Sequence, residues 1–235
     1  SSIYYDFLDG QEFTTTINWT LTPLTAGTVA AAATGTNGQL LLNCLAVDAQ
    51  GIGSFQNNVS AYTPSLADST DGLASRVISA AARFSHSDFS VSNWFFGLAA
   101  ADTTLMGTTG TLLTVGGDNC VGWHHVVDAV AQGGITGPDG NDVRMVSAGT
   151  AVANYQATLL SAAQVPLAAP ANASIDGVMV EYGIKIIGTQ GVEFYRNGIL
   201  RHRRQMAVAL TGPLTLSFGA VSNGTDENWL VDYVW

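Results

Sequence analysis

The amino-acid sequence predicts an all-β protein in which two antiparallel β-sheets pack face to face. Along most of the chain, apolar residues alternate with polar ones or form short runs, and a period of two residues is typical of β-strands. Dipeptides that favour tight turns separate these runs. The composition, 47% hydrophobic and only 11% charged, excludes a disordered chain and a coiled coil.

Each expected strand is an alternating or continuous apolar run that ends at Gly, Asn, Asp or Pro. In chain order, the expected strands cover residues 3–8, 13–20, 27–33, 39–47, 53–57, 75–84, 94–100, 111–115, 122–128, 142–147, 177–187, 192–196, 199–204, 214–220 and 228–235. About fifteen strands are more than one small sheet holds, so we expect two sheets around a common core.

The turns between these strands have a consistent chemistry, because an Asp or Asn followed by Gly supplies the positive φ angles of tight hairpins. Such dipeptides are Asp9-Gly10, Asn37-Gly38, Asp71-Gly72, Asp139-Gly140, Asp176-Gly177, Asn197-Gly198 and Asn223-Gly224. Asn197-Gly198 lies between two apolar runs, which makes it a hairpin prediction. On that hairpin Phe194 and Tyr195 should point to opposite faces.

Residues 151–173 depart from this rhythm. They contain Leu159-Leu160 and Ala162-Ala163, followed by Pro166 and Pro170. This pattern is compatible with a short helix that Pro166 ends, or with a long irregular loop, and both alternatives stay open. No repeat of fixed period and no linker divides the chain, so we expect a single β-sandwich domain over residues 1–235.

The charges exclude several classes of partner. The chain has 8 basic and 18 acidic residues, a net charge of −10, so we expect neither a nucleic-acid partner nor an anionic membrane surface. No apolar run is long enough to span a membrane, and the first residues do not resemble a signal peptide. With so few charges, much of the surface must be Ser, Thr, Asn, Gly and Ala. Such a surface suits a protein that neighbours cover.

Two cysteines, Cys44 and Cys120, are too few for a disulfide scaffold and lack the spacing of a zinc site. We favour two buried free thiols over one disulfide, because free cysteines concentrate in protein cores.

The hairpin at 178–187 and 191–200 carries a Glu193-Phe194-Tyr195-Arg196-Asn197-Gly198 edge. This hairpin resembles one in concanavalin A-like lectin/glucanase domains, whose fold is a two-sheet antiparallel jelly roll. Residues 213–219 and 229–235 resemble its last two strands, and residues 77–84 with 94–99 resemble an earlier strand pair. Members of that family are glycosidases, lectins or structural modules, so a site has to decide the function.

The sequence does not contain the carboxylates that catalysis by this family implies. Retaining glucanases carry an E-x-D-x-E run, which places nucleophile and acid on one face of a strand. The four glutamates, Glu12, Glu181, Glu193 and Glu227, have no acidic residue two positions away. We therefore expect that the protein is not an enzyme.

Other candidate chemistry is weak. His124 and His125 are adjacent on an expected strand beside Trp123, so they should face opposite ways and not bind one metal ion. The loop residues Asp118-Asn119, Asp139, Asn141 and Asp142, and Asp226-Glu227, offer oxygen ligands without the spacing of a calcium loop. We expect no metal or other cofactor, with calcium as the alternative.

The basic residues are unevenly distributed. Arg196, Arg201, Arg203 and Arg204 are four of the eight, and they lie within nine positions that also hold His202. On one strand, Arg201 and Arg203 share a face and Arg204 lies on the other. The arginines either bind an acidic partner surface or protect an edge strand from aggregation. Both interpretations stay open.

Two functions follow as hypotheses. Residues 96–105 are similar to a segment of lectin-like proteins from tailed bacteriophages, which implies a capsid decoration (cement) protein on the virion exterior. Its partners would be the major capsid protein or another virion protein, with assembly in the host cytoplasm, and we expect a homo-oligomer. The alternative is a carbohydrate-binding, lectin-like module of a fibre, with Trp123 or Tyr155 as the platform for a glycan.

Overall fold

The structure is a computed structural model. It describes residues 5–6, 19–24, 26–31, 39–44, 51–57, 77–88, 92–101, 105–106, 119–126, 142–148, 156–159, 176–222, 224 and 226–234. Every regular element in these ranges is a β-strand, which confirms the all-β prediction. No helix in the same ranges has the length and hydropathy that a membrane crossing requires.

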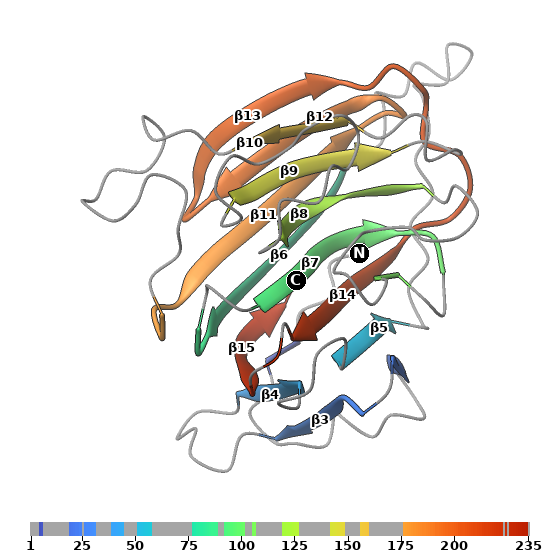
Figure 1. Ribbon diagram of the computed structural model, residues 1–235. Coiled ribbons are helices and arrows are strands. Elements are labelled where there is room, and N and C mark those ends of the chain that lie inside the picture. The colour runs from blue at the N-terminus through green and yellow to red at the C-terminus, as the bar shows by residue number, and fades with distance from the viewer. Residues whose placement is uncertain are drawn as a thin grey trace.

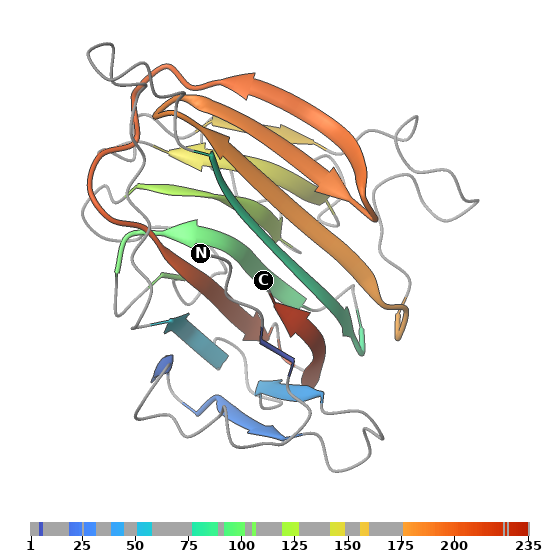
Figure 2. The same ribbon diagram turned by 180° about the vertical axis from the view of Figure 1, so that it is seen from behind.

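The described residues form two antiparallel sheets that pack face to face (Figure 1, Figure 2). The strands are β1 (Tyr5–Asp6), β2 (Trp19–Pro23), β3 (Thr28–Ala31), β4 (Leu40–Cys44), β5 (Gly51–Asn57), β6 (Val77–His86), β7 (Ser92–Ala99), β8 (Cys120–Val126), β9 (Asp142–Ala148), β10 (Gln156–Leu159), β11 (Val180–Ile187), β12 (Gly191–Arg196), β13 (Ile199–Gln205), β14 (Thr215–Ser222) and β15 (Glu227–Val234). The eight-stranded sheet has the order β13-β12-β11-β6-β15-β4-β3, with β1 beside β15. The seven-stranded sheet has the order β10-β9-β8-β7-β14-β5-β2.

Most of the predicted strands overlap observed ones, and one segment needs a correction. The expected strand 13–20 overlaps β2 only at Trp19 and Thr20, because residues 13–18 lie outside the described residues and β2 continues to Pro23. The expected strand 111–115 lies outside the described residues. Within 151–173, where we predicted a helix or a loop, residues Gln156–Leu159 form β10. This strand pairs with β9 at the edge of the seven-stranded sheet, with Gln156 opposite Ser147. Pairing with a neighbouring strand therefore decides the conformation of a segment whose local sequence carries no strand signal.

The hairpin predicted at Asn197-Gly198 is confirmed. Asn197 has a φ of 51° and Gly198 a φ of 72°, so both turn residues occupy the left-handed region that a two-residue hairpin turn requires. Across the preceding turn, β12 pairs with β11, and Glu193 lies opposite Lys185. As predicted, Phe194 is buried in the core whereas Tyr195 lies on the other face and is half-buried.

The main core lies between the two sheets and is rich in aromatic rings. The ring of Phe84 lies 5.1 Å from that of Trp94 and 5.0 Å from that of Tyr182. Trp123 packs against Tyr182 at 5.2 Å and against Phe194 at 5.8 Å. Phe84 and Tyr182 belong to neighbouring strands of one sheet, whereas the contacts of Trp94 with Phe84 and of Trp123 with Tyr182 and Phe194 join opposite sheets and hold the sandwich together.

A second apolar cluster covers the outer face of the seven-stranded sheet, the face directed away from the core. It consists of Phe95, Ala99, Leu105, Met106, Cys120, Val146 and Val221. A strand with apolar cover on both faces reads as a continuous apolar run, which explains Trp94-Phe95-Phe96 in β7. The outer face of the eight-stranded sheet carries the polar and charged side chains described below.

Both cysteines are free and buried, as predicted. Cys44, on β4 of the eight-stranded sheet, belongs to the main core, and Cys120, on β8 of the seven-stranded sheet, belongs to the outer cluster. The seven-stranded sheet therefore separates the two thiols. Burial raises the pKa of Cys44 to about 12, which keeps the thiol protonated at neutral pH.

Candidate functional site

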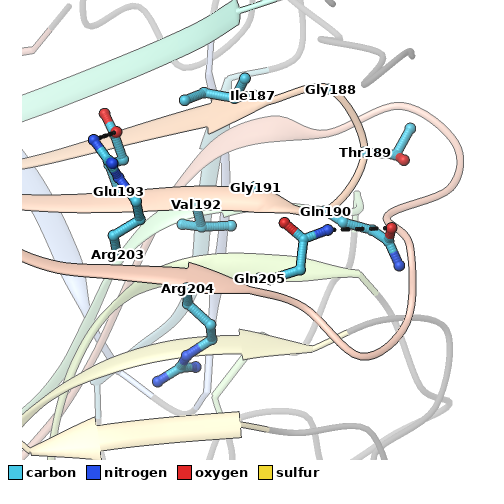
Figure 3. Close-up of a pocket in the computed structure, with 10 residues that line it drawn as sticks. All are labelled: Ile187, Gly188, Thr189, Gln190, Gly191, Val192, Glu193, Arg203, Arg204 and Gln205. Carbon is cyan, nitrogen blue, oxygen red and sulfur yellow. Dashed lines mark hydrogen bonds and ion pairs between the residues drawn. The ribbon is translucent and has the colours of Figure 1, made fainter.

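The four arginines predicted as a partner-binding patch do not share one surface. Arg196 is 7% exposed, and its guanidinium lies 5.9 Å from the ring centroid of Tyr182. Arg201 is half-buried, and its pKa is lowered by burial and by the charge of Arg196. Arg203 and Arg204 leave β13 in opposite directions, as the alternation predicts (Figure 3).

Arg204 closes one edge of the sandwich. Its Nη1 donates to Oγ of Ser147, 2.9 Å away, and its Nη2 donates to the carbonyl oxygen of Met145 at 3.1 Å. The guanidinium also lies 5.9 Å from the ring centroid of Phe194. Because Ser147 and Met145 belong to β9, this side chain joins the edge strand β13 to the other sheet. Of the four arginines, Arg203 is thus the one that points mostly to solvent, with 70% of its side chain exposed.

Arg203 belongs to a charged cluster around Glu193 on the outer face of the eight-stranded sheet. The Glu193 carboxylate lies 2.6 Å from Nη2 of Arg203 and 3.5 Å from Nζ of Lys185. It also accepts a hydrogen bond of 2.6 Å from the hydroxyl group of Tyr195. That hydrogen bond is the main reason why the pKa of Glu193 is lowered, with Arg203 and Lys185 contributing in the same direction. The same bond raises the pKa of Tyr195, and the cluster holds the Tyr195 side chain in place.

A hollow of about 210 Å³ lies beside this cluster. Its floor consists of Ala81 and Gly183, which are paired across β6 and β11 and lack large side chains. Lys185, Tyr195 and Glu181 surround the floor. Glu181 is itself oriented by a hydrogen bond from the Tyr233 hydroxyl group. The hollow therefore combines an aromatic ring with a carboxylate and an ammonium group.

A second hollow, of about 460 Å³, lies beside the turn between β11 and β12 (Figure 3). Its lining includes Thr189, Gln190 and Gln205, and the Gln205 amide nitrogen donates to Oε1 of Gln190 at 3.3 Å. The backbone N–H groups of Met206 and Leu210 donate to the carbonyl oxygens of Gln190 and Thr189, both at 2.8 Å, and fix the turn.

The Glu193 cluster connects the two hollows. Glu193 and Arg203 line the second hollow, whereas their partners Lys185 and Tyr195 line the first. Hydroxyl, amide and charged groups beside an aromatic ring are the groups that recognise a hydroxyl-rich ligand. We name the surface formed by the two hollows and the Glu193 cluster between them the polar trough. The sequence predicted that Phe194 and Tyr195 face opposite ways without deciding which of them is outward, and the small residues that create the hollow gave no signal.

The two carboxylates of the polar trough come from neighbouring strands. Glu193 of β12 lies opposite Lys185, which is four residues from Glu181 along β11.

The residues predicted as a glycan platform are placed differently. Trp123 is 0% exposed, and its Nε1 donates to the carbonyl oxygen of Gly183 at 3.0 Å. It therefore cannot stack on a sugar from solvent, which corrects that prediction. The error has a physical reason. Alternation predicts that Trp123 and His125 share one face of the strand, but it does not predict whether that face is directed to the core or to solvent. Tyr155 lies outside the described residues.

The histidine pair has the predicted geometry. His125 faces the core with its ring 5.9 Å from that of Trp94, and the intervening alternation places His124 on the outer face. The described part of the chain contains no group of three or more His, Cys, Asp or Glu side chains that could hold a metal ion. Calcium stays a prediction, because Asp118, Asp139 and Asn141 lie outside the described residues.

One buried carboxyl group carries no signal in the sequence. Glu227 is 0% exposed and accepts hydrogen bonds from Oγ of Ser87 at 2.9 Å and from the Asp88 backbone N–H at 3.0 Å. Burial raises its pKa to about 7. The two bonds show that it fixes the turn after β6. Its burial depends on the packing of β15 beside β6 and β4, which alternation alone does not reveal.

The sequence matches no protein-family model and no curated protein sequence. The fold, in contrast, is similar to solved structures. The catalytic domain of an endo-1,3-beta-glucanase (laminarinase) from Thermotoga petrophila matches 99% of this chain and 95% of its own, with 10% identity and a TM-score of 0.62. A GH16 protein of the Bacteroides ovatus mixed linkage glucan PUL, in complex with a G4G4G3G product, matches 99% of this chain and 98% of its own, with 12% identity and a TM-score of 0.61. Peanut lectin matches 99% of this chain and 95% of its own, with 18% identity and a TM-score of 0.57.

These likenesses show the fold. The protein is an all-β jelly roll of the concanavalin A-like type, as the sequence predicted, and the tailed-bacteriophage context stays a prediction. The expectation that the protein is not an enzyme is corrected, because glucanases and a transglycosylase share this fold. The missing E-x-D-x-E run excludes one arrangement of carboxylates, and the fold is compatible with catalytic groups of other types.

Proposed function

We propose that this protein binds a saccharide, and that the polar trough is the surface that binds it. The observation that carries the proposal is the hollow over Ala81 and Gly183, where the ring of Tyr195 lies beside Lys185 and Glu181. The fold similarity to glucanases and to a lectin supports the same class of ligand.

The side chains of the trough suit a sugar ring. An aromatic ring packs against the C–H face of a sugar, and charged or amide groups hydrogen-bond its hydroxyl groups. Tyr195 is already fixed by its bond to Glu193, so little side-chain entropy is lost on binding. The second hollow adds the amides of Gln190 and Gln205, which extends the surface to more than one sugar unit.

The test compares Tyr195→Ala with Tyr195→Phe. A glycan array identifies a ligand of the natural protein, and calorimetry then measures its affinity. We expect Tyr195→Ala to weaken binding about tenfold or more, because it removes the central aromatic contact. Tyr195→Phe keeps the ring and should have a smaller effect. In the same variant the pKa of Glu193 should rise, which carboxyl ¹³C NMR measures directly.

Asp226→Asn is the matched control, because Asp226 is exposed and lies outside the trough. It should bind like the natural protein. Equal affinity of Tyr195→Ala and Asp226→Asn for the glycan would refute the trough as the binding surface. Absence of any glycan ligand would refute saccharide binding itself.

A second candidate function, a capsid decoration protein on the virion exterior, is favoured by the edge of the eight-stranded sheet. There Ile199 is 52% exposed and Leu200 43% exposed, next to Arg201 and Arg203 on β13. Exposed apolar residues beside basic ones suit a partner with an acidic, partly apolar surface, such as a major capsid protein or a further copy of this chain.

The test of this second function is binding to capsids that lack the protein, followed by electron microscopy. Arg201→Glu combined with Arg203→Glu should lower capsid occupancy while leaving the circular dichroism spectrum unchanged. Unchanged occupancy would argue against β13 as the contact, and absence of the protein from purified virions would argue against the decoration role.

A further inference from the structure

Arg144 occupies an unusual position on the outer face of the seven-stranded sheet. It lies on β9 directly opposite His124 of β8, and His124 in turn lies opposite Phe95 of β7. Figure 1 shows these three strands side by side, with β9 next to the edge strand β10. Because directly paired residues share a face, and Phe95 belongs to the outer cluster, Arg144 and His124 lie on the outer face.

Arg144 is buried, and the described residues give it no counter-charge. Its exposed fraction is 0%, and its Nε and Nη1 atoms have no hydrogen-bond partner among the described residues. The same residues form no ion pair with it, whereas Arg83 and Arg203 each pair with a carboxylate and Arg204 hydrogen-bonds to β9. A guanidinium group is always charged. A buried charge with unused donors is costly unless an anion or another acceptor compensates it.

We propose that Arg144 forms an anion site on the outer face of the seven-stranded sheet, and that it binds an oxyanion such as a carboxylate or a sulfate. Both groups are planar or compact acceptors that match the N–H donors of a guanidinium. His124, which is also 0% exposed, is placed beside the anion by the strand register.

Apolar side chains of the outer cluster pack on neighbouring strands of the same face. The Phe95 ring lies over Gly97 and Gly122, where an added Cβ atom would come within 2.8 Å and 2.5 Å of the ring. Met106 packs on Gly219 of β14, and its backbone N–H donates to the carbonyl oxygen of Gly53 of β5. These two strands lie on the side of β7 that is remote from β9. Val146 of the same cluster lies on the outer face of β9, two residues from Arg144.

The oxyanion has two sources, a free inorganic anion or the acidic substituent of a sugar. The second source rests on the proposed saccharide function, and the first does not. We therefore use three probes at constant ionic strength: sodium sulfate, D-glucuronate, and D-glucose as the neutral counterpart of glucuronate. Each is titrated against the natural protein, Arg144→Gln and Arg83→Gln. Arg83→Gln is the matched control, since it removes the same charge from an exposed position.

We expect sulfate to raise the melting temperature of the natural protein and of Arg83→Gln, in a saturable way. In Arg144→Gln the affinity should fall about tenfold or more, because charged hydrogen bonds are lost. If glucuronate behaves like sulfate and glucose does not bind, the site takes an acidic sugar. If sulfate alone binds, the site takes a free anion. Equal binding of sulfate to Arg144→Gln and to Arg83→Gln would overturn the proposal.

A second measurement does not depend on whether Arg144→Gln folds. Crystals of the natural protein are soaked in selenate, whose anomalous signal marks its position. The proposal predicts a peak within hydrogen-bonding distance of the Arg144 guanidinium. If no selenate peak appears and a carboxylate of the same chain lies beside the Arg144 guanidinium instead, the proposal is overturned. A neutral glycan tests the polar trough separately. If Tyr195→Ala loses binding of that glycan and Arg144→Gln retains it, the polar trough is supported, and the sulfate and selenate results alone decide the anion site.

Discussion

The indole Nε1 of Trp123 donates a hydrogen bond to the carbonyl oxygen of Gly183, 3.0 Å away in the opposite sheet. Trp123 belongs to β8 of the seven-stranded sheet and Gly183 to β11 of the eight-stranded sheet. Gly183 is also the floor of the smaller hollow of the polar trough. A core residue of one sheet therefore supports the candidate binding surface on the other.

We expect Trp123→Phe to lower the free energy of unfolding by about 1–3 kcal/mol. The substitution removes a buried hydrogen bond and leaves a small cavity between Tyr182 and Phe194. Urea denaturation followed by circular dichroism measures the change. A variant as stable as the natural protein would mean that the hydrogen bond does not help to hold the two sheets together.

Arg204 and Arg203 are neighbours with opposite roles, so they form a matched pair. Arg204→Met should cost about 1–3 kcal/mol of stability, because two hydrogen bonds to β9 are lost and their acceptors lose a partner. Arg203→Met should cost less than about 1 kcal/mol, since Arg203 is 70% exposed in an ion pair with Glu193. Equal losses in thermal denaturation would contradict the inward role of Arg204.

Glu227 should make the protein less stable as the pH rises. Its pKa is raised from 4.5 to about 7 in the folded state, so the folded state holds the proton more tightly than the unfolded chain. Stability then falls between pH 4.5 and 7, by about 3 kcal/mol from this group. Glu227→Gln keeps an acceptor for Ser87 and Asp88 but removes the titration. It should therefore be more stable than the natural protein at pH 8 and similar to it near pH 4.

His86 should act in the opposite direction. Burial lowers its pKa from 6.5 to about 4, so the folded state favours the neutral ring and stability is lost as the pH falls from 6.5 to 4. In the natural protein the two groups offset each other between pH 4.5 and 6.5. In Glu227→Gln the opposing effect of Glu227 is removed, whereas His86 and His202, whose pKa values are both lowered by burial, still favour neutral rings in the folded state. Denaturation midpoints measured from pH 4 to 8 should therefore fall steadily toward acid. A flat profile would contradict this assignment.

Gly122 should not tolerate a side chain. A Cβ atom there would lie 2.5 Å from the Phe95 ring and 2.5 Å from the carbonyl oxygen of Phe96. Gly122→Ala should therefore destabilise the protein by about 1–3 kcal/mol through overpacking. Gly183→Ala is the control, because the nearest atom, Cβ of Tyr195, is 3.3 Å away. Calorimetry should show a clearly larger loss for Gly122→Ala.

Much of the fold follows from local sequence. Alternation locates most strands, and the Asn197-Gly198 dipeptide fixes a hairpin whose two turn residues have the positive φ angles expected. The same rule correctly predicts that Phe194 and Tyr195 face opposite ways, as do Arg203 and Arg204. Strand β10 was missed because its conformation depends on pairing with β9 and not on its own residues.

The roles of individual side chains could not be predicted from the sequence, because they depend on which face of a strand is buried and on which residues lie across the sandwich. Alternation divides a strand into two faces but does not say which face is the core, so Trp123 was mistaken for a surface platform. It also does not say what lies across the sandwich. Arg204 reaches Met145 and Ser147 on another sheet, and four arginines that are close in sequence therefore take different roles.

The sequence by itself determined the all-β class and the turns, because these depend on residues that are close together in the chain. The scarcity of charge follows directly from the composition. Only the tertiary structure decided where the few charges act. It gathers Lys185, Glu193 and Arg203 from three strands on one sheet, and it buries Arg144 beside His124 on the other. Burial and charge pairing arise from contacts between distant segments, and these contacts exist once the two sheets have packed.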